Sequence, residues 1–235
     1  VGLVFLMFKI ASLASISVFF NCLLASGFNN NIDFNALLTD PSFNFLDSKQ
    51  KINLTGESAE STNGFSYLIN KPELKIKSEN LYTNIKALNG ELNRTTEIID
   101  FRNSVTFYTL LDEEIIIESE KLSFDLNMKK FMSNEPVFAS FYDVNINSLG
   151  LEVFQDSEGI KAIFNKGEVR IKNHQNYLTG YANQITILSE LNEMIMDGEA
   201  FIDQDGLKIK SQTIHYNLKE NRIIKSLNST IENKG

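Results

Sequence analysis

The chain has 235 residues, with 22 Lys and Arg against 30 Asp and Glu, a formal net charge of −8 and 43% hydrophobic residues. This apolar fraction excludes a wholly disordered chain, and the acidic balance argues against a nucleic-acid-binding surface. One Cys and two His exclude a disulfide framework, a multi-cysteine metal site and a histidine-rich metal centre, so no cofactor is expected.

The first 27 residues differ from the rest of the chain. Lys9 is the only charged residue among them, and the side chains from Ile10 to Phe28 are mostly apolar or small. Nineteen helical residues span roughly 28 Å, about the hydrocarbon thickness of a bilayer. We predict an apolar helix that is either a membrane anchor or a cleaved signal peptide, with Ala25 and Gly27 at the −3 and −1 positions. Either alternative places the rest of the chain outside the cytoplasm.

Beyond Phe28 the hydrophobic period is two, which predicts half-buried strands. The segments are short, recur about every 8–12 residues and are separated by Asn, Asp, Gly and Ser turn signals. Gly206 ends one such turn, and Gly159 ends another. The stretch 185–196 is the nearest helical candidate, but its alternation fits strands as well. The clearest alternating segments are Leu74–Lys77, Val105–Phe107, Leu122–Leu126, Val144–Asn147, Leu151–Val153, Val169–Ile171 and Leu207–Lys210.

The strands also repeat. One pattern occurs three times, at 99–107, 163–171 and 195–202. A strand is followed by Gly or Asn, then by one further residue, then by a small or β-branched residue, after which the strand resumes. A second unit at 119–126 matches 211–218, and a charged turn and a new apolar strand follow each copy. Such β-units stack into a sandwich or a rolled sheet that buries one face.

The order of these motifs resembles the OstA-like periplasmic domain of lipopolysaccharide export, the family of LptC and LptA, over roughly Phe34 to Asn233. The part resembling LptC carries the stretches Pro41-Ser-Phe43, Leu54-Thr-Gly56-Glu-Ser-Ala59, Asn70-Lys-Pro72-Glu-Leu74, Ser133-Asn-Glu-Pro136-Val137 and Ile146-Asn-Ser148-Leu-Gly150-Leu151. The part resembling an LptA-type repeat carries Asp197-Gly198-Glu-Ala200, Gln204-Asp-Gly206-Leu207-Lys-Ile209 and Ile214-His-Tyr216-Asn217. We therefore expect a signal peptide or anchor at 1–27 and one OstA-like domain at 28–235, LptC-like over 28–172 and LptA-like over 173–235.

The resemblance implies an all-β fold, a rolled antiparallel sheet or open β-jellyroll preceded by the apolar helix. It implies a non-enzymatic periplasmic protein whose interior holds the acyl chains of lipopolysaccharide. Its partners would be other OstA-like proteins, joined edge to edge, and the inner-membrane ABC transporter LptB/LptF/LptG, without nucleic acid. The helix would hold it at the inner membrane unless a signal peptide is cleaved.

Alternation then selects the side chains that would line the lipid trough, although each is also an ordinary core position. They are Phe107, Ile117, Leu122, Phe124, Phe131, Phe141, Val153, Ile163, Val169, Ile187, Ile195, Ile202, Ile209 and Tyr216. The last strands would present a partner edge with Ile223, Leu227 and Ile231.

The remaining charged residues and the histidines do not indicate a catalytic or metal-binding site. The acidic run 112–114 is expected to be a hairpin loop, and His174 lies in a polar linker. His215 is expected on the face opposite Ile214 and Tyr216. No catalytic triad order or phosphate loop is present in the sequence. An exported structural or adhesive repeat protein without a lipid ligand, and a periplasmic enzyme on a β-sandwich, remain as alternatives.

Overall fold

The computed structural model describes residues 36–46, 49–62, 64–110, 114–155, 159–173, 176–204 and 206–233. These residues form antiparallel strands and one short 3₁₀ turn, which confirms the all-β prediction. The stretch 185–196 forms the end of one strand, the 3₁₀ turn and the start of the next strand rather than a helix. The expected N-terminal helix lies outside the described residues.

The elements follow in chain order. They are β1 (Leu37–Thr39), β2 (Ser42–Leu46), β3 (Lys51–Thr55), β4 (Ser58–Thr62), β5 (Ser66–Asn70), β6 (Glu73–Lys77), β7 (Tyr82–Lys86), β8 (Asn89–Asn93), β9 (Ile98–Leu110), β10 (Glu114–Asp125), β11 (Lys130–Ser133), β12 (Val137–Phe141), β13 (Val144–Ser148), β14 (Leu151–Gln155), β15 (Ile160–Asn173), β16 (Asn176–Leu188), η1 (Ser189–Leu191), β17 (Glu193–Gln204), β18 (Leu207–Asn217), β19 (Arg222–Leu227) and β20 (Thr230–Asn233).

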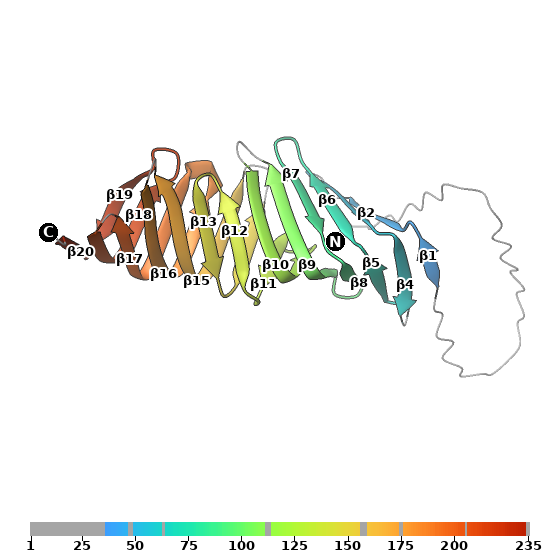
Figure 1. Ribbon diagram of the computed structural model, residues 1–235. Coiled ribbons are helices and arrows are strands. Elements are labelled where there is room, and N and C mark those ends of the chain that lie inside the picture. Colours follow the sequence, from blue (N-terminus) through green and yellow to red (C-terminus); the bar gives the residue numbers. More distant parts are fainter. Residues whose placement is uncertain are drawn as a thin grey trace, which may run out of the picture.

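The strands form one long sheet folded lengthwise into two half-sheets. Half-sheet 1 has the order β1-β4-β5-β8-β9-β10-β11-β14-β15-β16-β17-β18-β19. Half-sheet 2 has the order β2-β3-β6-β7-β9-β10-β12-β13-β15-β16-β17-β18-β20. The six long strands β9, β10 and β15 to β18 therefore run through both. The result is an elongated body with β1 at one end and β20 at the other (Figure 1).

A crease joins the half-sheets, and the sequence repeat marks it. Asn103 and Ser104 in β9, Lys166 in β15, and Gly198 and Glu199 in β17 all have positive φ, between 49° and 73°. The strand register shifts beside these positions in β9–β10, β16–β17 and β17–β18. Such β-bulges bend a strand, and Gly and Asn adopt left-handed backbone most readily. The repeated Asn103 and Gly198, and in the second copy Lys166 just before Gly167, therefore mark the corner at which a strand passes from one half-sheet to the other.

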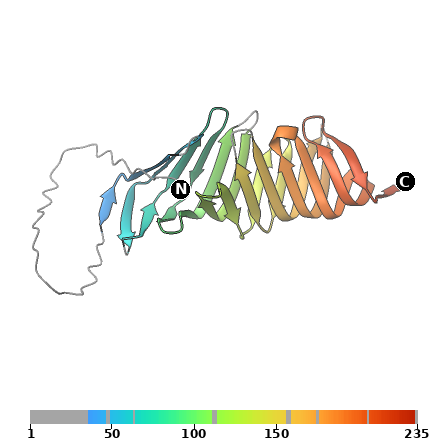
Figure 2. The ribbon, with the colours of Figure 1, turned by 180° about the vertical axis from the view of Figure 1, so that it is seen from behind.

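The inner faces of the two half-sheets pack on each other in a single core that runs the length of the body. Seen from behind, the strands form the same elongated body (Figure 2). Alternating strand positions supply it. In β14, for example, Leu151 and Val153 are buried, and Phe154 is exposed on the outer face. The core also runs without a break from the expected LptC-like part to the expected LptA-like part, because β15 and β16 pair with each other along both half-sheets. The described turns at 78–81 in half-sheet 2 and at 94–97 in half-sheet 1 lie at the margins away from the crease, and we call the line along which the two margins face each other the mouth.

Candidate lipid-binding trough

The space between the half-sheets forms a trough with an apolar lining. In its middle, the Phe131 ring stacks on Phe124 at 4.3 Å between centroids and meets Phe107 edge-on at 5.1 Å. Phe107 lies in half-sheet 2, whereas Phe124 and Phe131 lie in half-sheet 1. The three rings therefore fill the space between the half-sheets and pack the trough shut at this level.

The structure places most of the expected lining residues on this inner surface. Those that are buried there are Phe107, Ile117, Leu122, Phe124, Phe131, Phe141, Val153, Val169, Ile187, Ile202 and Tyr216. Ile209 is partly buried and packs against the same core. Sequence reasoning did not select several further inner residues, among them Phe101, Phe164, Met194 and Met196.

The expected inward orientation is wrong for Ile163 and Ile195, which lie half-buried on the outer face. Their neighbours Phe164 and Met194 are buried inside instead. Both isoleucines stand in continuously apolar stretches, where alternation does not identify the inner face. In β15 the buried positions also change phase at Lys166, which has a positive φ, so Ile163 is out of step with the buried Val169.

Polar contacts cross the mouth at three places. Thr83 in half-sheet 2 is hydrogen-bonded to Gln155 in half-sheet 1, at 2.9 Å. The Tyr142 hydroxyl donates to Asn192 Oδ1 at 2.6 Å, and the Asn221 amide donates to the carbonyl of residue 172 at 3.5 Å. These contacts close the mouth over the middle and C-terminal parts of the trough.

The Thr83 contact belongs to a buried polar cluster within the apolar interior. Thr83 and Thr109 are 0% exposed, and their hydroxyls lie 2.9 Å apart. The Thr109 hydroxyl also donates to the Tyr82 carbonyl at 3.1 Å, and one terminal atom of the Gln155 amide has no partner among the described residues. The Thr83 hydroxyl donates to Gln155 Oε1, so the atom without a partner among those residues is Gln155 Nε2.

Tyr216 closes the C-terminal part of the trough. Its ring is buried, and its hydroxyl donates to Asn221. Burial and the negative charge of Asp143 together raise the pKa of Tyr216 to about 12. The phenol therefore stays neutral at physiological pH.

Both ends of the body carry two edge strands that pair on one side only within the described part of the chain. They are β1 and β2 at one end and β19 and β20 at the other. Of the expected partner-edge residues, Ile223 is packed against the core, whereas Leu227 and Ile231 are 41% and 65% exposed. Ile231 pairs with Ile209 and so continues the inner face, whereas Leu227 pairs with Thr213 on the outer face.

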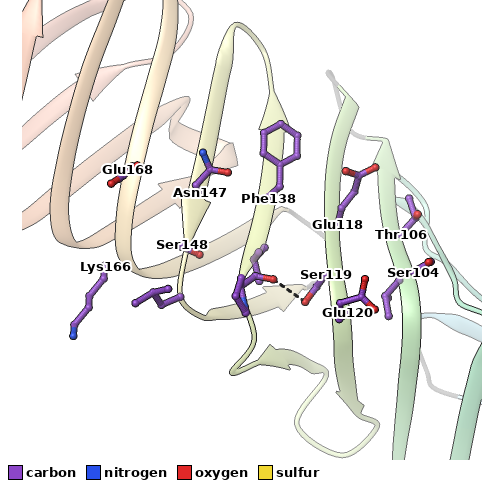
Figure 3. A pocket seen from close by; sticks show the side chains of 14 residues that line it. Ser104, Thr106, Glu118, Ser119, Glu120, Phe138, Asn147, Ser148, Lys166 and Glu168 are labelled. Atoms are coloured by element: carbon purple, nitrogen blue, oxygen red, sulfur yellow. Dashed lines mark hydrogen bonds between the residues drawn. The ribbon is translucent and has the colours of Figure 1, made fainter.

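Several ion pairs lie on the outer surface, among them Lys75–Glu73 at 2.9 Å and Lys130–Glu152 at 2.9 Å. A shallow groove of about 870 Å³ runs over β9, β10, β12, β13 and β15 beside the crease, with Glu118, Phe138 and Asn147 on neighbouring strands (Figure 3). His215 bonds the Glu193 carboxylate on this outer face, as its alternation with Ile214 and Tyr216 predicts.

Neither a metal site nor a membrane-spanning helix is found in the described residues. No three His, Cys, Asp or Glu side chains gather there in a way that could hold a metal ion. Within the same residues, no helix has the length and apolar character needed to cross a bilayer. His174 lies outside them.

Two family models match the sequence. One family model, described as "Lipopolysaccharide-assembly, LptC-related", matches residues 47–163. A second, described as "LptA/(LptD N-terminal domain) LPS transport protein", matches residues 116–222. No curated protein matches the sequence significantly. Among solved structures, LptH from Pseudomonas aeruginosa, described as the LptA homologous periplasmic component of the conserved lipopolysaccharide transport device, is 11% identical. Its alignment covers 53% of this chain and 97% of LptH, with a TM-score of 0.47. The two matches overlap and together cover residues 47–222, so the chain is similar to both lipopolysaccharide-transport families, and the matches support an OstA-like lipopolysaccharide-transport protein.

Proposed function

We propose that this chain is a non-enzymatic periplasmic carrier that holds the acyl chains of lipopolysaccharide between its half-sheets. The observation that carries the proposal is the continuous apolar core, which runs from one pair of free edge strands to the other. Burying a methylene group is favourable by about 0.8 kcal/mol, so an apolar trough of this length suits a lipid with several acyl chains. The two family matches support the same role.

The free edge strands give the carrier a way to join its partners. We propose that other OstA-like domains add their strands to β1 and β2 at one end and to β19 and β20 at the other. The inner faces would then continue from domain to domain as a bridge. In this bridge the chain would receive lipopolysaccharide from the inner-membrane transporter LptB/LptF/LptG. Its segment 1–27 would anchor it or direct its export, and residues 28–172 and 173–235 would correspond to LptC-like and LptA-like parts.

Photo-crosslinking on the two faces of one sheet tests the lipid path. A benzophenone amino acid at Phe124 or Phe164, both buried inside, is expected to form adducts with lipopolysaccharide. The matched control is Ile163, which neighbours Phe164 on the outer face and is expected to form none. Equal labelling of both faces, or no adduct from any inner position, would contradict the proposal and favour a structural repeat protein without a ligand.

A further inference from the structure

The N-terminal end of the trough contains a small apolar cavity of about 120 Å³. It lies between edge strand β2 of half-sheet 2 and the margin of half-sheet 1. Its walls are the side chains of Phe43, Phe45, Tyr67, Leu92 and Leu126, and its remaining lining residues are Arg94 and Glu97. We call this cavity the N-terminal port.

The walls of the port are continuous with the core of the trough. Phe43 and Leu92 are members of that core, and Phe45, Tyr67 and Leu126 pack against it. The rings of Phe43 and Tyr67 meet across the two half-sheets at 5.1 Å, tilted by 56°. The port is therefore an apolar cavity at the N-terminal end of the same core, and the polar contacts at Gln155, Asn192 and Asn221 lie further along the body.

A charged rim borders this apolar opening. Arg94 and Glu97 belong to the turn between β8 and β9, and the Arg94 backbone N–H donates to the Phe65 carbonyl at 2.9 Å, which fixes the turn. Neither the Arg94 guanidinium nor the Glu97 carboxylate has an ion-pair or hydrogen-bond partner among the described side chains. Arg102, by contrast, lies 3.1 Å from Glu91 and 3.3 Å from Asp100.

We propose that the N-terminal port is a subsite for a phosphorylated amphiphile. Its acyl end would contact the aromatic walls of the port, and its phosphate would bind the Arg94 guanidinium. Guanidinium presents a planar fork of N–H donors that matches phosphate oxygens two at a time. The Glu97 carboxylate accepts a hydrogen bond from a hydroxyl or amine of the same headgroup. The proposal rests on the proposed function and adds to it a subsite for the headgroup and the residue that binds the phosphate.

The test uses the full 235-residue chain with a benzophenone amino acid at Phe45 or Tyr67. It is exposed to phosphatidylcholine vesicles that carry either lipid A or its dephosphorylated form. We expect adducts with lipid A to exceed those with the dephosphorylated form by about tenfold, the worth of one exposed charge-assisted hydrogen-bond pair. Arg94→Gln is expected to abolish this preference and Arg94→Lys to keep only part of it. The matched control Arg102→Gln, which removes a paired outer-face guanidinium, is expected to keep the preference in full.

A probe at Phe124 separates this proposal from the proposed function. If the Phe124 probe still forms lipid adducts and Arg94→Gln leaves the phosphate preference unchanged, the proposed subsite at the port is wrong, whereas the proposed lipid-carrying trough is supported. If neither Phe124 nor Tyr67 forms adducts, the carrier function itself fails. Millimolar inorganic phosphate is expected not to displace lipid A, and displacement would mean a site for a free anion. A Tyr67 adduct with residues 1–35 of the chain would make that segment the occupant and overturn the port.

Discussion

At the scale of single residues, the polar cluster of Thr83, Thr109 and Gln155 is the main departure from an apolar interior. It joins the two half-sheets, and its hydrogen bonds lie where water does not reach. A buried polar group contributes to stability only while its partners are present. The cluster therefore stabilises the closed arrangement of the half-sheets and disfavours separations that break the Thr83 contact.

Removing one member of this cluster is expected to cost more than removing two. Thr83→Val leaves the Gln155 amide buried without a partner and is expected to lower the free energy of unfolding by about 1–3 kcal/mol. The double variant Thr83→Val with Gln155→Met removes both partners and is expected to recover most of that loss. Urea unfolding followed by circular dichroism measures both, and additive losses would show that the two side chains are not coupled.

Tyr216 makes a pH-dependent contribution. Its pKa is about 12 in the folded chain against 10 for an ordinary tyrosine. The unfolded chain therefore loses this proton first as the pH rises, and the stabilisation present below pH 10 is lost between pH 10 and 12, by about 3 kcal/mol. Tyr216→Phe is expected to be less stable at neutral pH because it loses the Asn221 bond, but to show a shallower decline over that range. Parallel curves for the two proteins would contradict this assignment.

At the scale of elements, backbone groups at the crease find hydrogen-bond partners within the chain, whereas those at the edges leave a ladder open to another strand. At the crease, Ser119 and Ser211 occupy matching positions of the two repeat copies, and each hydroxyl donates to the carbonyl two residues ahead, at 3.1 Å and 2.8 Å. These hydroxyl groups thus hydrogen-bond to backbone carbonyls where the bend interrupts the regular ladder. At the C-terminal edge, β19 and β20 are almost wholly exposed and their outer ladders are unpaired within the described residues. Such an edge attracts another strand.

Ile231 is the position at which edge docking can be tested with least damage to the fold. It is exposed but in register with the inner face, so Ile231→Lys is expected to change monomer stability by less than about 0.5 kcal/mol. It is expected to abolish crosslinks from a benzophenone at Leu227 to another OstA-like protein in cells. Ile223 is a poorer choice, because it packs on the core and its substitution would also disturb the monomer. Undiminished crosslinks in the Ile231→Lys chain would count against edge-to-edge docking.

At the scale of the whole molecule, the trough is closed in this structure. Its lining side chains are packed, and Tyr142–Asn192 and Asn221–Lys172 join the margins across the mouth. Acyl chains can enter only if the half-sheets separate about the crease, because a packed core leaves no space for a guest. The carrier is then expected to open at the mouth, where a few hydrogen bonds hold it, rather than at the crease, where the strands are continuous.

Holding the mouth shut is therefore expected to block loading. With Cys22 replaced by Ser, cysteines at Tyr142 and Asn192 can be joined across the mouth by a short bismaleimide. The joined protein is expected to lose lipid adducts at Phe124, whereas the same protein treated with a monofunctional maleimide is expected to keep them. Equal adducts in the two samples would show that lipid enters without separation of these margins.

The sequence by itself determined the strands, their inner faces over most of the chain and the repeat, because alternation and turn residues are local properties. Leu122, Phe124 and Tyr216 were placed inside by period two alone, since each stands between polar neighbours. Only the tertiary structure decided the orientation of Ile163 and Ile195, because the buried positions of β15 change phase after Ile163, at the positive-φ residue Lys166, and both isoleucines have apolar neighbours. It also decided which margins meet: Thr83 and Gln155 are 72 residues apart, and no local pattern records that the fold brings them together. The N-terminal port depends on the same long-range closure, since Phe43 and Tyr67 face each other only when the two half-sheets fold together.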